Sequence, residues 1–198
     1  MSKNNGVYQL IIENLKMIEQ TNGILDEIQE NVFNQIDKYI NSWAKENSWS
    51  CEGSFWIKGP QKFYPTHWDK KFSYFSFDLD DDIKNENISW LSYLNGSEHT
   101  KLGLCWCFSY GSKYQLQEWQ KELKRQYDNN RSLFEKNNAK IVYGGRNLFI
   151  PITQDISELI ENYPNGIDTV LEDPVNKALN CLNNIFPVID QIYTKLTN

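Results

Sequence analysis

The stretch FSYFSFDL, residues 72–79, indicates the fold class of this 198-residue chain. Phe75, Phe77 and Leu79 recur at every second position, so they lie on one face of a β-strand. The opposite face, which includes Tyr74, mixes polar and aromatic residues. Strands with one apolar and one mixed face are typical of antiparallel sheets that pack against helices.

Further runs of period two surround this strand, at residues 50–58, 88–94 and 102–109. Together the four runs predict an antiparallel meander of about four strands. Two short apolar runs, 141–143 and 148–150, flank Gly144 and Gly145. This glycine pair supplies the positive φ angles of a tight turn, so we predict a β-hairpin after the meander.

The segments on either side of the sheet have helical spacing. Residues 24–46 repeat apolar side chains at steps of three and four, and they form the clearest helix in the sequence. A shorter helical pattern precedes it, and the run Thr21 to Gly23 is a stop and restart signal. We therefore predict an N-terminal helical hairpin.

The second half of the chain contains further helix signals. Ser112 is a suitable N-cap for a long central helix. Asp155 and Glu158 form a capping box, Asp173-Pro174 opens a last helix, and Pro187 should kink or split it.

The predicted protein is a single α+β domain over residues 1–198. It has an antiparallel sheet, a meander of about four strands plus a hairpin, packed against an N-terminal helical hairpin, a long central helix and C-terminal helices. The predicted segments are a helical hairpin (1–47), a sheet (48–111), a helix (112–138), a hairpin (139–152) and helices (153–198).

Composition narrows the function. The net charge of -6 and the pI near 5.0 disfavour direct nucleic-acid binding. The four cysteines are expected to be reduced, and the first residues show no signal peptide or membrane span, which predicts a cytoplasmic protein. Abundant Asn, Lys and Ile with few alanines indicate an AT-rich genome, such as that of a low-GC bacterium or its phage.

Catalytic motifs are missing from the sequence. Neither the phosphate-binding loop with Gly-Lys-Ser/Thr nor the Gly-x-Gly-x-x-Gly loop occurs. A nucleophilic site would need His67, oriented by Asp69, beside Cys51 or Cys105. A zinc site would need Cys105 and Cys107 with His99 and Cys51. Burial of the cysteines as small core residues explains them better. We predict no catalytic residue, no metal ligand and no cofactor.

An acidic run, Asp78 to Asp82, ends the best strand. Asp78 and Asp80 share a strand face, so a metal-dependent hydrolase or nuclease using Asp78, Asp80 and Asp82 is the alternative function. A solvated turn that ends the strand is the favoured explanation. The Gly and Glu that a calcium loop requires at its sixth and twelfth positions are replaced by Ile83 and Ser89.

Aromatic residues are too concentrated between residues 55 and 77 for one sheet face to bury them all. We predict that some remain exposed beside the acids, unless helices cover that face. Exposed rings bordered by charge are typical of protein-binding surfaces. The predicted binding residues are Phe63, Tyr64, Trp68, Asp69, Phe72, Tyr74, Asp78, Asp80, Asp81 and Asp82.

The sequence therefore favours a non-enzymatic protein-binding module. It would occlude another protein, as an inhibitor, immunity protein, antitoxin or phage anti-defence protein does. A partner that normally holds nucleic acid would suit the acidic surface. The apolar stripe of residues 24–46 also fits a homodimer, and a small-molecule pocket between sheet and helices stays open as a third function.

Overall fold

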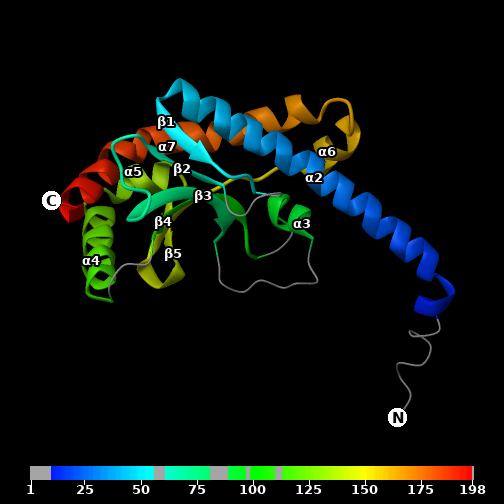
Figure 1. Ribbon diagram of the computed structural model, residues 1–198, viewed down its shortest axis with the longest axis horizontal. Coiled ribbons are helices and arrows are strands. Elements are labelled where there is room, and N and C mark those ends of the chain that lie inside the picture. The colour runs from blue at the N-terminus through cyan, green and yellow to red at the C-terminus, as the bar shows by residue number, and fades with distance from the viewer. Residues whose placement is uncertain (1–9, 56–60, 81–88, 97–98, 110–112, 198) are drawn as a thin grey trace, which may run out of the picture.

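Six strands form one antiparallel sheet at the centre of the molecule (Figure 1). The computed structural model describes residues 10–55, 61–80, 89–96, 99–109 and 113–197, with the backbone alone at 113 and 114. The strands lie in the order β1-β2-β3-β4-β6-β5. Their bounds are Trp49–Glu52 (β1), Lys62–Pro65 (β2), Ser73–Leu79 (β3), Leu102–Phe108 (β4), Lys140–Val142 (β5) and Asn147–Pro151 (β6). The predicted meander and hairpin are confirmed.

The two central strands show the predicted alternation. Phe75 of β3 lies opposite Trp106 of β4 on the apolar face of the sheet. The other residues of β3 and β4 on this face are buried or half-buried. On the other face, Gly103 of β4 lies against β6. A Cβ added at Gly103 would lie 2.1 Å from the carbonyl oxygen of Ile150, so no side chain fits there.

Helices α2 (Leu15–Glu46) and α7 (Ile167–Thr197) pass along the apolar face of the sheet (Figure 1). Ile36 of α2 and Leu182 of α7 belong to the same buried cluster as Phe75. Two other helices, α3 (Trp90–Leu94) and α4 (Lys113–Asn129), lie toward opposite ends of the sheet in this view. The core thus joins segments from both halves of the chain.

Aromatic rings from distant segments meet in this core. The ring of Trp106 lies 4.4 Å from that of Trp119 in α4 and 5.9 Å from that of Trp68. Trp68 in turn stacks on Tyr193 of α7 at 4.3 Å. Aromatic pairs at such distances contribute about 0.5–1.5 kcal/mol beyond the burial of their area. They fix the positions of α4 and α7 against the sheet.

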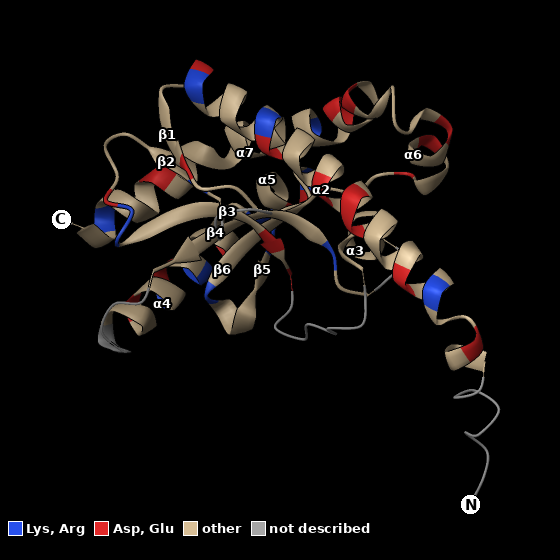
Figure 2. Ribbon diagram, turned by 45° about the vertical axis from the view of Figure 1, so that its right-hand side comes forward, with Lys and Arg blue, Asp and Glu red and all other residues tan. Residues whose placement is uncertain are grey.

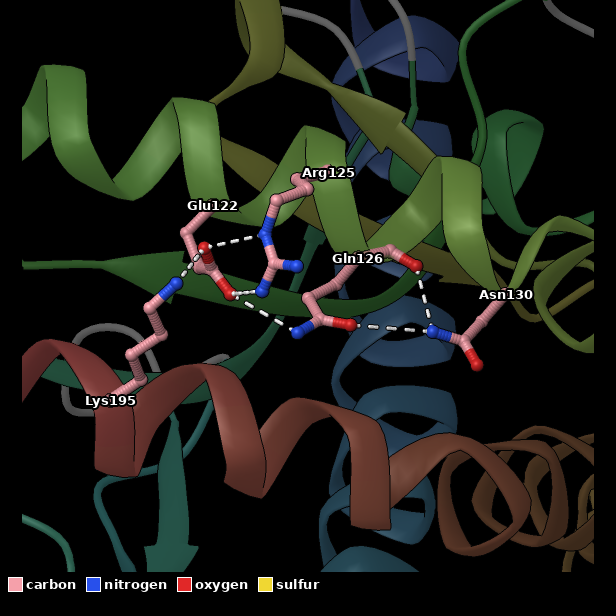
Figure 3. Close-up of polar contacts among 5 residues, drawn as sticks. All are labelled: Glu122, Arg125, Gln126, Asn130 and Lys195. Carbon is pink, nitrogen blue, oxygen red and sulfur yellow. Dashed lines mark hydrogen bonds and ion pairs between the residues drawn. The ribbon is translucent and has the colours of Figure 1, made fainter.

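A buried carboxylate also joins α4 to α7 (Figure 3). Glu122 of α4 is buried and accepts hydrogen bonds from Arg125 Nε at 3.0 Å, from Gln126 at 3.1 Å and from Lys195 of α7 at 2.7 Å. The guanidinium of Arg125, followed by Lys195 and Gln126, lowers the pKa of Glu122 to about 2. The carboxylate therefore stays charged at neutral pH.

The predicted N-terminal helical hairpin is wrong, because α2 continues through Gly23. The Thr21 hydroxyl donates a hydrogen bond to the carbonyl of Met17 within the helix instead of capping a new one. An exposed glycine costs a helix only about 1 kcal/mol. The strong apolar stripe that follows offsets this cost.

Residues 88–94, predicted as a strand, contain helix α3. Ser89 caps it, since its hydroxyl accepts a hydrogen bond from the Leu91 N–H at 3.2 Å. So short an apolar run fits either period. Another segment completes the four-stranded meander: β2 lies between β1 and β3 and pairs Phe63 with Phe75.

The remaining helices partly follow prediction. The central helix divides into α4 and α5 (Arg131–Lys136), and Asp155 caps α6 (Ile156–Asn162) as predicted. Helix α7 begins before Asp173-Pro174, and both Pro174 and Pro187 lie inside it. Its buried stripe stabilises the helix enough to offset the hydrogen bonds that the prolines remove.

Candidate protein-docking surface

The predicted aromatic surface is largely internal. Phe63 and Trp68 are buried, so the expectation that their rings face outward is wrong. Trp68 lies under α7, where its Nε1 donates a hydrogen bond to Asp190 Oδ1 at 2.8 Å. Helix α7 supplies a cover more than a hundred residues away in sequence, which local patterns do not reveal.

The other predicted aromatics are half-buried. Phe72 packs against Trp119 at 5.9 Å, and the ammonium of Lys62 lies 4.3 Å from the centre of the Tyr74 ring. Tyr64 is also half-buried. Asp69 is exposed, and its N–H donates to the hydroxyl of Tyr193 at 2.6 Å. These residues do not form a continuous exposed surface.

The described part of the acidic run has structural roles. The side chain of Asp80 is 6% exposed, and it accepts hydrogen bonds from the Lys101 N–H at 2.8 Å and from Lys140 Nζ at 2.6 Å. Asp78 accepts from the N–H of Leu79. Asp81 and Asp82 lie outside the described residues. Lys140, which is ion-paired with Asp80, would compete with any metal ion for that carboxylate.

The histidine and cysteine residues do not assemble as a nucleophilic site would require. His67 Nε2 lies 2.9 Å from Asp190 Oδ1, so Asp190 and not Asp69 orients the ring. Burial raises the pKa of Cys51 to about 11, and the pKa of Cys105 lies well above its usual value because of its contact with Cys107 and its burial. Both thiols are protonated at neutral pH.

Metal ligands do not gather in the described part of the chain. Within residues 10–55, 61–80, 89–96, 99–109 and 113–197, no three His, Cys, Asp or Glu side chains lie close enough to hold an ion. The Asn147 amide donates to the sulfurs of both Cys105 and Cys107, at 3.4 Å and 3.7 Å. These contacts explain the thiol pair as a packed cluster.

The largest apolar exposure lies elsewhere, on residues 10–28, which we call the arm. The arm projects away from the sheet as the first half of α2 and the residues before it (Figure 1). Leu10 is 61% exposed, Ile12 72%, Met17 59% and Ile24 59%. Exposed apolar side chains grouped in this way are typical of an interaction site.

The second half of α2 has the opposite character. Val32, Phe33, Ile36 and Ile40 are fully buried against the sheet and α7. The stripe that suggested a homodimer through residues 24–46 is therefore largely occupied within the chain. One helix thus combines a core half with an arm.

The arm carries acids beside its apolar side chains. Glu13, Glu19, Asp26 and Glu27 flank them, against a single basic residue, Lys16. Figure 2 shows acidic residues along the projecting helix. The arm is thus amphipathic and negatively charged.

A groove lies beside α2, next to the arm. It has a volume of about 660 Å³ and is lined by the polar residues Asn31, Asn34, Asp37 and Asn41, and by Tyr163 and Ile167. Asp37 is only 4% exposed. Burial raises its pKa to about 6, although the Phe55 N–H, which donates to Oδ2 at 2.9 Å, opposes this change.

Comparisons add no assignment to this geometry. Protein-family models, curated proteins and solved structures were all searched, and none matches the chain. Among the helices of the described residues, none combines the length and apolarity that crossing a membrane requires.

The sequence did contain the residues of the arm. Leu10, Ile11 and Ile18 belong to the shorter helical pattern that predicts the first helix of a helical hairpin. An apolar stripe predicts that something covers it, but not whether the cover belongs to the same chain. The continuous helix at Gly23 is what leaves the stripe exposed.

Proposed function

We propose that this chain is a non-enzymatic protein-binding module that occludes a partner protein by inserting the arm into an apolar groove on it. The observation that carries the proposal is the exposure of Leu10, Ile12, Met17 and Ile24 on the arm, whose helix α2 extends beyond its own core. An amphipathic helix laid in a groove is a recurring mode of protein recognition.

The width of the apolar face favours a groove. Two pairs at seven-residue spacing lie on the first half of α2, namely the exposed Met17 and Ile24 and the half-buried Ile18 and Leu25. A two-stranded coiled coil uses a narrow seam, whereas a wide face is buried between walls. A groove on a larger protein meets this need better than a second arm.

The negative charge of the arm indicates which residues surround the groove on the partner. The acids of the arm, Glu13, Glu19, Asp26 and Glu27, require lysine or arginine around the apolar contact. A second copy would bring a second set of acids instead. An anionic membrane surface would repel the arm for the same reason.

A basic-rimmed partner is typical of proteins that hold nucleic acid. The small chain, with its net charge of -6, would compete with phosphates as an inhibitor, immunity protein, antitoxin or phage anti-defence protein does. A cytoplasmic location is part of this proposal, and the four unpaired cysteines support it.

The test compares the full chain with an arm variant, Met17→Gln with Ile24→Gln. Proteins captured by the wild type are identified and purified, and their affinities are measured by calorimetry at low and high salt. Burial of two such side chains is worth about 3–6 kcal/mol, so we expect a loss of about a hundredfold or more in the variant. Binding by the wild type should also weaken with salt.

Ile160→Gln is the matched control, because Ile160 is an equally exposed apolar residue on α6. It should bind like the wild type. Equal binding by the wild type and the arm variant would refute the proposal. The proposal would also be refuted if ultracentrifugation showed that the chain binds only a second copy of itself through the arm.

A further inference from the structure

The polar groove beside the arm has an acceptor without a donor. Asp37 Oδ2 accepts from Phe55, but Oδ1 is buried and has no hydrogen-bond partner among the described residues. Such a buried carboxylate oxygen costs free energy unless a donor or a positive charge reaches it.

A second acceptor in the same condition lies nearby. Gln61 is fully buried, its Nε2 lies 3.4 Å from the main-chain oxygen of Asp37, and its Oε1 is unpaired among the described residues. Gln61 is not among the residues that line the groove, so the unpaired acceptor on the groove is Asp37 Oδ1. A group with several N–H donors and a positive charge complements this arrangement.

The chain's own lysine on the groove does not fill this role. Lys38 lines the groove, but its ammonium donates to Gln35 Oε1 at 3.2 Å, and no ion pair with Asp37 is found in the described part of the chain. The rest of the polar lining consists of four amide side chains and the hydroxyls of Ser54 and Tyr163, and the amide oxygens are further acceptors for N–H groups.

We propose that this groove binds a guanidinium or ammonium group over Asp37, and that a basic side chain of the partner supplies it. The claim that the partner supplies the cation rests on the proposed function, because the arm and the groove lie in succession along α2. The apolar arm and a single arginine or lysine would then contact one continuous partner surface. Guanidinium fits best, since its planar fork presents five donors.

The first experiment uses n-propylguanidinium as a probe of the isolated full chain, with binding followed by NMR. A ligand of this size should bind with a roughly millimolar Kd. Asp37→Asn keeps an oxygen for the Phe55 N–H and removes the charge, so binding should fall by about tenfold or more. Asp173→Asn, which removes an exposed charge outside the groove lining, should bind like the wild type.

A second variant keeps the test decisive if Asp37→Asn does not fold. Asn41 is exposed on the groove wall, and Asn41→Trp fills the groove while leaving Asp37 unchanged. It should abolish binding of the probe. Probe binding that survives both changes, or no binding to the wild type at tens of millimolar, would overturn the groove site.

The same variants separate the two proposals on the identified partner. Loss of affinity in Asp37→Asn, reproduced when one arginine or lysine of the partner is changed to glutamine, supports the partner as the source of the cation. If the probe binds but no arm-dependent partner exists, the proposed function fails and the site for a free cation stands. If the arm variant loses the partner while Asp37→Asn does not, the partner as cation source is refuted.

Discussion

Changing Glu122 to glutamine tests how α4 is attached to α7. The carboxylate is buried and accepts hydrogen bonds from Arg125, Gln126 and Lys195. Glutamine keeps the size of the side chain but removes the charge. We expect the variant to fold and to be less stable than the wild type at neutral pH.

The pKa of Glu122 sets an upper limit to the effect. It falls from 4.5 to about 2, and each unit corresponds to 1.36 kcal/mol, so the carboxylate stabilises the fold by at most about 3 kcal/mol. Arg125 and Lys195 are about half exposed, and solvent screens them. We therefore expect a loss of about 1–2 kcal/mol.

The pH dependence gives the sharper test. Because folding lowers this pKa, the stabilisation is fully present above about 4.5 and is lost as the pH falls toward about 2. Urea unfolding of the wild type and Glu122→Gln, followed by backbone circular dichroism, should differ at pH 7 and converge near pH 2. Asp128→Asn, which removes an exposed carboxylate of α4 that is ion-paired with Arg131 of α5, is the control. A difference that stays constant with pH would refute the reasoning.

Three further predictions follow from the described geometry. Gly103→Ala should lower the free energy of unfolding by several kcal/mol or prevent folding, because the new Cβ would collide with the carbonyl of Ile150; urea unfolding checks this. Asp37→Asn should be more stable than the wild type at pH 8 and should lose this advantage near pH 4. Burial raises the pKa of Asp37 from 3.8 to about 6, so the wild type loses up to about 3 kcal/mol of stability as the pH rises through this range. Urea unfolding of both proteins at the two pH values measures the difference. Met17→Gln with Ile24→Gln should change stability by less than about 0.5 kcal/mol per site, since both side chains are exposed; a larger loss in thermal unfolding would mean that the arm packs within the chain.

The fold was predictable where a local pattern had one structural solution. The alternation through Phe75 and Phe77 and the turn at Gly144-Gly145 fix β3 and the β5–β6 hairpin, and both glycines have positive φ. Short or weak signals failed. Gly23 did not end a helix, and residues 88–94 formed a helix, because tertiary contacts decide between periods of similar strength.

The candidate site was less predictable, since it depends on what covers each side chain. Trp68 and Phe63 have the aromatic character of a binding surface, but α7 and α2 bury them. Leu10 and Met17 have the spacing of core residues, yet they are exposed. The unpaired oxygen of Asp37 left no mark in the sequence, because it results from the contact of α2 with Phe55 and Gln61.

The tryptophans that meet in the core also give the protein an internal optical reporter. Trp68, Trp106 and Trp119 come from three separate segments, and neighbouring rings in this series lie 4.4 Å and 5.9 Å apart. Indoles held so close in fixed orientations couple electronically, so their near-ultraviolet signal depends on all three segments at once. Loss of that signal with helix content unchanged would reveal loosened packing before the chain unfolds.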